Sequence, residues 1–333
     1  MNVNIKRVAA HAGVSTATVS HVINGTRYVS PETEKKVNDA LRDLKYTPSA
    51  IAKSLRIQKT HTIGLMMPIM VPNFSDEYNM RIAYGIRNGL RLRSYNLILG
   101  STDNTMEGER DQIKMFVTQR VDGLIMMPSR SDEEYLTELR DLKIPVVFID
   151  RMAKGEYGDC VLCDNYSGAH NAVTALIGKG HKKIGFMTNN EKVTTSFDRL
   201  RGYRAALSEA GLDMDEGLIR IGDCAFDSGR RFMRELYEEC GVTAVFAADN
   251  LMAMGALSYV NNEGIDMPKD LAFITFDEHD WENAMKPSIS AVKQPSYELG
   301  LKAAQMMLER IENPQKPFET CILSTQLLLR ESV

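Results

Sequence analysis

The sequence predicts a small helical domain followed by a larger α/β core of two lobes, each a parallel, doubly wound sheet. Residues 4–46 carry helix start and stop signals in close succession, whereas from His61 onward apolar stretches alternate with amphipathic ones. Near-continuous apolar strands separated by helices are typical of parallel sheets that are covered on both faces. The 333 residues exceed one ordinary domain and suffice for two or three.

Three short helices are predicted in the first part of the chain. The first covers about 5–12, the second follows Ser15 as its N-cap, and the third follows Ser30. Two short helices joined by a tight glycine turn, with a third packed behind them, form the helix-turn-helix arrangement of many DNA-binding proteins. A three-helix bundle without a role in DNA binding fits the same pattern, so the helices alone do not decide the function.

The rest of the chain contains two successive series of strands and helices, which predict two doubly wound lobes. Strands of the first series are expected at about 62–68, 96–101, 123–128 and 146–150. Strands of the second series are expected at about 160–164, 183–188, 218–221, 244–248 and 271–277. The tail adds a strand at 289–293, a helix at about 296–312 and strands near 318–329.

These patterns define the predicted domains. A headpiece covers 1–60 and includes a short hinge helix at about 49–56, and a core covers 61–333. Within the core, the first lobe covers about 61–161 plus 292–322, and the second covers about 162–291 plus 323–333.

Charge is distributed unevenly along the chain. Residues 1–60 hold ten Lys and Arg against four Asp and Glu, a net charge of +6, while the remainder carries 30 basic and 40 acidic residues. A basic head on an acidic body indicates a polyanionic partner for the head. A solvated basic face is the alternative, and charge alone does not choose between them.

The apolar segments and the cysteines of the sequence indicate the cellular compartment and the state of the thiols. No stretch of 18 apolar residues and no signal peptide is present, so the chain is expected to be cytoplasmic. Its five cysteines are an odd number, which argues against a disulfide framework. Cys160 and Cys163 lie three apart on a predicted strand and therefore point to opposite faces. They are expected to be buried thiols, not a metal or redox pair.

Three ordered strings in the headpiece resemble the lac/galactose repressor family. They are Val-Ser-Thr-Ala-Thr-Val-Ser-His-Val-Ile-Asn-Gly at 14–25, Val-Ser-Pro-Glu-Thr at 29–33 and Tyr-Thr-Pro-Ser-Ala-Ile-Ala-Lys-Ser-Leu-Arg at 46–56. The headpiece is most similar to the purine-responsive members, and the resemblance runs to Leu-Arg-Glu-Ser at 329–332. It implies a DNA-binding regulator that reads a near-palindromic operator as a homodimer and responds to a small effector.

The resemblance assigns DNA contacts to the second helix and its surroundings. It implies that Thr16, Ala17 and His21 contact base edges, with the Ala17 methyl suited to the methyl group of thymine. Residues that would contact phosphates, which position a protein without specifying sequence, are Ser15, Ser20, Asn24, Arg27 and Tyr28.

The hinge is about two turns long, too short to be a stable helix alone in water. In the family, two hinge helices of a dimer pair in the minor groove and a leucine wedges between base pairs. Leu55 matches that leucine, and an apolar wedge kinks the duplex. A plain linker with a buried leucine is the alternative.

Two parallel lobes offer a ligand cleft at the carboxyl ends of their strands. Candidate effector-binding residues follow these strands: Asn73, Phe74 and Arg151 in the first lobe, and Arg199, Asp249 and Asp277 in the second. The resemblance supports Phe74 as a stacking aromatic and Arg199 and Asp277 as ligand-binding residues. A strand-end Asp that caps the next helix, or an Arg paired on the surface, is the alternative at each position.

Several positions differ from the family pattern. Asp249-Asn250 reverses the Asn-Asp order of its sugar-responsive members, and Cys224 stands where an aromatic is common. Val193 stands at about the position where purine-responsive members have an arginine. The effector is therefore expected to be a sugar, sugar acid or sugar phosphate and not a purine. Arg151 and Arg199 would suit an anion.

Two other classes of protein share parts of this pattern. A transport solute-binding protein has the same two-lobed, periplasmic-binding-protein-like core, but it carries a signal peptide and no helix-turn-helix. An α/β enzyme would need a motif such as a nucleophile elbow, a P-loop or a dinucleotide fingerprint, and the sequence has none. His279, Asp280 and Glu282 cluster near Asp277, and they are expected to form a solvated face. No catalytic residue, cofactor, metal or membrane contact is predicted.

Overall fold

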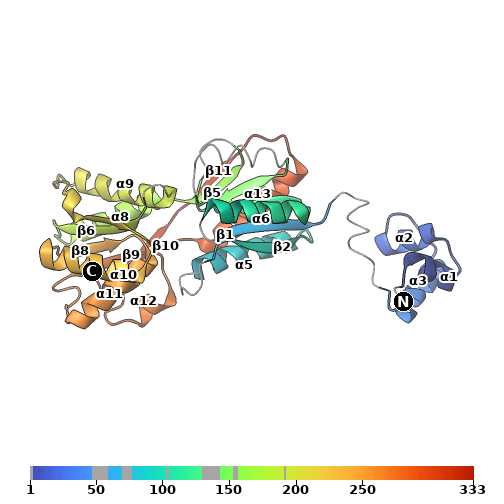
Figure 1. The fold of residues 1–333 in the computed structure, drawn as a ribbon, viewed down its shortest axis with the longest axis horizontal. Helices are drawn as coiled ribbons and strands as arrows, with labels where there is room; N and C mark the ends of the chain where they lie inside the picture. The colour runs from blue at the N-terminus through green and yellow to red at the C-terminus, as the bar shows by residue number, and fades with distance from the viewer. Residues whose placement is uncertain are drawn as a thin grey trace. The chain divides into compact units, whose positions relative to one another are not determined.

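The computed structural model describes residues 3–46, 59–69, 77–102, 105–129, 143–152, 157–190 and 193–333. The chain forms two compact units, Met1–Thr60 and His61–Val333 (Figure 1). The predicted hinge helix at 49–56 lies outside the described residues.

The first unit is the three-helix domain that the cap signals predict. It contains α1 (Ile5–Ala12), α2 (Thr16–Asn24) and α3 (Pro31–Asp43). The side chains of Asn4, Ser15 and Ser30 each accept a hydrogen bond from a backbone N–H of the first turn of the helix that follows. Gly13 closes α1 in the left-handed region, with φ of 66°, which glycine adopts without steric cost. A small core centred on the fully buried side chains Val8, Val19 and Val37 holds the helices together.

The first lobe of the second unit is built on a parallel sheet of order β11-β5-β4-β3-β1-β2. Its strands are β1 (Thr62–Pro68), β2 (Asn96–Thr102), β3 (Gly123–Met126), β4 (Val146–Ile149), β5 (Asp159–Cys163) and β11 (Thr320–Leu323). The helices of this lobe are α5 (Glu77–Arg91), α6 (Met106–Thr118) and α13 (Ser296–Glu312) (Figure 1).

The second lobe has a sheet of order β12-β10-β9-β8-β6-β7. Its strands are β6 (Ile184–Asn189), β7 (Ile219–Gly222), β8 (Ala244–Ala247), β9 (Ala272–Phe276), β10 (Ser290–Lys293) and β12 (Gln326–Leu328). The accompanying helices are α8 (Asn165–Gly178), α9 (Thr194–Glu209), α10 (Phe226–Arg234), α11 (Asn250–Glu263) and α12 (Asp280–Ala284). β12 differs from the predicted parallel sheets, because it pairs antiparallel with β10. β5 also differs from the prediction, which placed the strand at about 160–164 in the second series, because it pairs with β4 in the first sheet.

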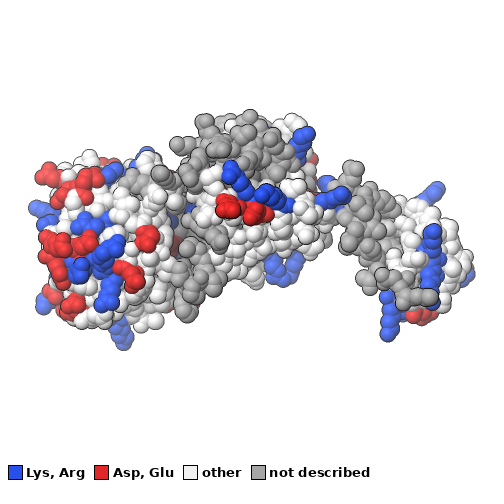
Figure 2. Space-filling model, viewed as in Figure 1, with Lys and Arg blue, Asp and Glu red and all other residues white. Residues whose placement is uncertain are grey.

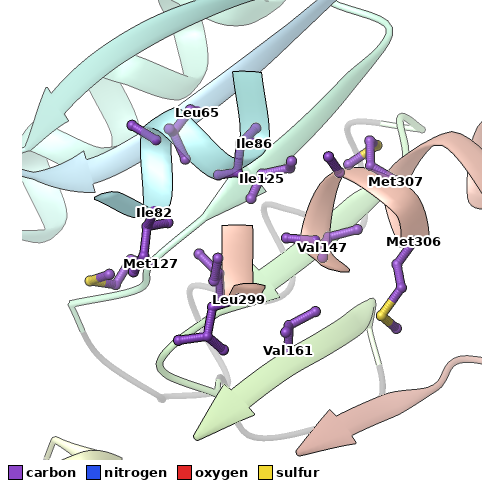
Figure 3. Close-up of a cluster of buried hydrophobic side chains, with 14 of the residues drawn as sticks. Leu65, Ile82, Ile86, Ile125, Met127, Val147, Val161, Leu299, Met306 and Met307 are labelled. Atoms are coloured by element: carbon purple, nitrogen blue, oxygen red, sulfur yellow. The ribbon is translucent and has the colours of Figure 1, made fainter. Parts of the chain in front are cut away.

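The two faces of the first sheet pack against different helices. Figure 3 shows one face, where Ile82 and Ile86 of α5 and Leu299 of α13 meet apolar side chains of the sheet. Cys163 belongs to this cluster, while Cys160 belongs to the cluster under α6 on the opposite face. Both are buried free thiols, as predicted, and burial raises the pKa of Cys160 to about 11.

Helices α5 and α13 approach each other closely because glycines face each other at their crossing. A Cβ added at Gly85 would lie 2.2 Å from the carbonyl oxygen of Tyr297, and one added at Gly300 would lie 2.1 Å from that of Ile82. This packing holds the first turn of α5 next to the chain segment that enters α13.

The chain crosses between the lobes after β5, between β10 and α13, and between β11 and β12. The second crossing includes Gln294, which is 6% exposed. These crossings place the carboxyl ends of strands from both sheets around one cleft.

Candidate effector cleft and DNA-binding helix

The candidate base-reading residues lie at the start of α2. Ser15, Thr16 and Ala17 are exposed, and His21 is half-buried one turn after Ala17. His21 Nδ1 lies 2.9 Å from Thr26 Oγ1, so the ring is held with Nε2 as its other hydrogen-bonding atom.

The candidate phosphate contacts differ in how firmly the structure holds them. Asn24 Nδ2 donates to the carbonyl oxygen of Ser20 at 2.6 Å, while Arg27 and Tyr28 are exposed, Tyr28 at 86%. In the view of Figure 2 most of the charged side chains on the headpiece are Lys and Arg, whereas the second lobe shows acidic side chains interspersed with basic ones. Leu55 lies outside the described residues.

The core contains a cleft of about 900 Å³ that both lobes line. This volume is within the range of small-molecule sites. Four of the predicted effector-binding residues line it: Arg151, Arg199, Asp249 and Asp277. Asn73 and Phe74 lie outside the described residues.

Arg199 of α9 is a buried guanidinium held by the second lobe. Its Nε donates to Asn165 Oδ1 and its Nη1 to the carbonyl oxygen of Ala248, both at 2.8 Å. The guanidinium carbon lies 3.7 Å above the ring of Phe276. Because these two hydrogen bonds use Nε and Nη1 and the side chain lines the cleft, Nη2 is the guanidinium nitrogen left for a ligand there.

The two second-lobe carboxylates occupy different positions. Asp277 follows β9 with φ of 75°, an unusual conformation for a side-chain-bearing residue, and accepts a hydrogen bond from Gln294 Nε2. Asp249 caps α11 by accepting from the backbone N–H of Met252 at 3.1 Å, the role that strand-end Asp residues commonly have. It also lines the cleft, and burial raises its pKa.

In the first lobe, Arg151 lies beside an acid that the sequence reasoning did not single out. Asp150 is 6% exposed, has φ of 65°, and its Oδ2 lies 3.7 Å from Arg151 Nε. Burial raises the pKa of Asp150. Its place directly after β4 is the same strand-end signal that identified Asp249 and Asp277.

Other cleft residues carried no sequence signal. Tyr78, Asn189, Phe226 and Gln294 line the cleft, and so do Cys224 and Val193, where the family pattern places other side chains. Nothing in the spacing of these residues distinguishes them from ordinary helix and loop positions.

The cluster after β9 is only in part the solvated face that the sequence predicts: Asp280 is exposed, as expected, but His279 and Glu282 are not. His279 is 4% exposed and Glu282 is fully buried. His279 Nδ1 lies 3.0 Å from Glu77 Oε2 of α5, and Glu282 Oε2 accepts from the backbone N–H of His279 at 2.6 Å. These partners replace water, so both polar side chains can be buried.

The burial of Glu282 makes stability depend on pH. Burial raises the pKa of Glu282 to about 7 from its ordinary 4.5, and its buried Oε1 has no partner among the described residues. A raised folded-state pKa means that the free energy of unfolding is highest below pH 4.5 and falls as the pH rises from about 4.5 to 7, above which this group changes it no further. Glu282→Gln should remove this loss, which we expect to be on the order of 1 kcal/mol per pH unit. Thermal unfolding at pH 5 to 8 measures it, with exposed Glu209→Gln as the control; equal slopes in all three proteins would contradict the prediction.

Comparison with known families and proteins decides the identity. Residues 4–49 match the family described as bacterial regulatory proteins, lacI family, and residues 173–333 match the periplasmic binding protein-like domain. The ribose operon repressor of Haemophilus influenzae is 34% identical over 330 residues, which cover 99% of this chain and 98% of that protein. This chain belongs to the LacI family.

Other LacI-family proteins are similar along their whole length. The HTH-type transcriptional repressor PurR of Escherichia coli O139:H28 is 35% identical over 332 residues, covering 99% of this chain and 96% of that protein. The structure of a transcriptional regulator CelR–cellobiose complex is 30% identical, with a TM-score of 0.76 and coverage of 99% and 100%. The lac repressor dimer bound to operator and the anti-inducer ONPF shares the fold, with a TM-score of 0.89 at 22% identity and coverage of 100% and 99%.

As a LacI-family member, the chain is a DNA-binding transcription regulator with an effector-binding core, and its similar relatives are repressors and not enzymes. The matching lacI headpiece also separates it from transport solute-binding proteins, which share only the core. Within the described ranges, no helix is long and apolar enough to cross a membrane. No group of three or more His, Cys, Asp or Glu in that part of the chain could hold a metal ion.

Proposed function

We propose that this LacI-family regulator binds a near-palindromic operator as a homodimer and that an uncharged sugar in the cleft sets its DNA affinity. A two-fold dimer reads two half-sites, for which α2 supplies the exposed Thr16 and Ala17 and the half-buried His21. Ser15, Ser20, Asn24, Arg27 and Tyr28 would contact phosphates, and Leu55 would act as the wedge. Because effector and DNA each shift the same conformational equilibrium, their effects on each other's affinity are reciprocal.

The proposal of an uncharged ligand rests on the excess of carboxylates that line the cleft. Among the described residues, the acids Asp150, Asp223, Asp249 and Asp277 line it, against the guanidiniums Arg151 and Arg199. Burial raises the pKa values of Asp150 and Asp249, and the nearby guanidiniums of Arg151 and Arg199 do not fully offset this effect. A phosphate or carboxylate on the ligand would add to this unfavourable charge, so a neutral ligand fits the cleft better than an anion.

Sugar hydroxyls match the hydrogen-bonding groups that remain. Asp150, Asp249 and Asp277 accept hydrogen bonds from Tyr78, Met252 and Gln294, respectively, and Asp249 has a second hydrogen-bond partner in Cys224. A carboxylate accepts up to about four hydrogen bonds, so acceptor sites are left over for hydroxyl donors. The guanidinium of Arg199 and a carboxylate such as Asp277 can bind neighbouring hydroxyls of a sugar through charge-assisted hydrogen bonds. The ribose and cellobiose in the names of two relatives support a sugar.

Thermal-shift screening of the full-length protein tests the ligand class. Each uncharged sugar is paired with its charged counterparts: D-ribose with ribose 5-phosphate, and D-glucose with glucose 6-phosphate and glucuronate, with cellobiose added as a disaccharide. At 100 times its dissociation constant, a ligand stabilises the folded state by about 2.7 kcal/mol. We expect stabilisation by at least one uncharged sugar. Stabilisation by phosphorylated or acidic sugars alone would overturn the assignment.

A further inference from the structure

The first turn of α5 contacts both a cleft carboxylate and the second lobe. The Tyr78 hydroxyl donates to Asp150 Oδ1 at 2.5 Å, and the same oxygen lies 3.3 Å from Gln294 Oε1. Burial and the neighbouring Asp150 raise the pKa of Tyr78 well above 10, so the hydroxyl remains a donor. The hydroxyl has one hydrogen and faces two acceptor oxygens. Its hydrogen bond to Asp150 is the shorter and therefore the stronger of the two contacts.

Gln294 extends this contact to the opposite lobe. It lies on the crossing between β10 of the second sheet and α13 of the first lobe, and it is buried. Its Nε2 donates to Asp277 Oδ1, while its Oε1 faces Tyr78. The side chains Asp150, Tyr78, Gln294 and Asp277 therefore form a continuous polar link across the cleft.

A second contact joins the same turn to the second lobe. Glu77, next to Tyr78, lies 3.0 Å from the ring of His279, whose side chain is only 5% exposed. The start of α5 is thus anchored to residues that follow β9, on the same loop as Asp277.

We propose that Tyr78 and Gln294 are positioning residues that fix the spacing of Asp150 and Asp277, so that the two carboxylates bind one effector together. This inference rests on the proposed function, in which both carboxylates accept hydroxyls of a sugar. Opening the cleft would have to break a contact in the link, because its ends belong to different lobes. A ligand that bridges the two carboxylates favours the spacing that the link already holds, and this pre-organisation increases affinity.

Hydrogen exchange of the full-length protein, without added sugar, tests the link directly. Tyr78→Phe keeps the ring and removes the hydroxyl. We expect amide exchange to become about tenfold faster in both lobes, at the first turn of α5 and at residues 277–279. Tyr297→Phe is the matched control, since it removes a hydroxyl that accepts from Asn88 Nδ2 at 3.2 Å within the first lobe. A change confined to the first lobe in both variants would overturn the inference.

A double-mutant cycle asks whether the two residues act through one link. Gln294→Met alone should accelerate exchange at 277–279 about as much as Tyr78→Phe, and the double variant should be no faster than either. Additive effects would contradict a shared link.

Measuring the affinity of the variants for sugars distinguishes a failure of this inference from a failure of the proposed function. For each uncharged sugar of the panel (D-ribose, D-glucose and cellobiose) that stabilises the wild type, Tyr78→Phe should weaken affinity about tenfold, and Tyr297→Phe should leave it unchanged. Equal affinities in both variants would contradict the positioning role. If none of these sugars binds the wild type, the assigned ligand class fails, while the exchange measurements still decide whether Tyr78 and Gln294 join the lobes.

Discussion

Replacing Arg199 by Met is expected to abolish the response of DNA binding to the effector sugar, while DNA binding without sugar persists. The change removes two hydrogen bonds within the second lobe and the only guanidinium that α9 buries in the described part of the cleft. Charge-assisted hydrogen bonds contribute about 1.5–3 kcal/mol each, so loss of two to a sugar should weaken binding about 100-fold or more. Calorimetric titration with the sugar identified by thermal shift measures this loss.

The same helix offers a matched control for this prediction. Arg201 lies two residues further along α9, is 55% exposed and pairs with Asp198 at 3.1 Å on the surface. Arg201→Met removes the same charge from the protein without reaching the cleft, and its sugar affinity should match the wild type. If Arg199→Met binds the sugar as well as Arg201→Met does, Arg199 does not belong to the effector site.

The largest loss of stability is expected from Arg310→Met. Arg310 and Asp159 form an ion pair with two hydrogen bonds of 2.9 Å, and their side chains are 4% and 0% exposed. Arg310 also donates to carbonyl oxygens of the segment that follows α13, including that of Pro317 at 2.9 Å. Removing one partner leaves a buried, uncompensated carboxylate, which costs about 3–5 kcal/mol in the free energy of unfolding.

Denaturant unfolding of the purified variants measures this cost. The control is Arg204→Met, which breaks an exposed ion pair with Glu216 and should cost less than about 1 kcal/mol. The double variant Asp159→Leu with Arg310→Met should recover part of the loss, because an apolar pair leaves no buried charge. Equal losses for the buried and exposed pairs would contradict the predicted cost of a buried, uncompensated carboxylate.

Much of the fold could be predicted because buried parallel strands are almost continuous apolar runs. β4 and β8, for example, are buried at every residue. The tail was harder, since apolar residues near 318–329 indicate strands but not their partners. Their pairing depends on tertiary contacts: β11 joins β5 in parallel, and β12 joins β10 antiparallel in the other sheet.

The candidate site was predictable where it depends on strand ends. The rule that ligands bind at the carboxyl ends of parallel strands indicated Asp249 and Asp277, and it could have indicated Asp150. It could not indicate Tyr78 and Gln294, which are 216 positions apart and meet only because the chain crosses between the lobes. The burial of His279 and Glu282 was also beyond sequence reasoning, because their partners include Glu77, at 202 positions from His279.

The most direct test of the account measures DNA affinity and sugar together. A duplex selected by the full-length protein from a randomised pool is labelled, and its binding is followed by fluorescence anisotropy at one fixed salt concentration. We expect a near-palindromic selected sequence whose affinity changes at least tenfold on addition of an uncharged sugar that stabilises the protein, and no such change in Arg199→Met. An affinity for this duplex that is the same with every uncharged sugar, or that changes only with anionic sugars, would contradict the account.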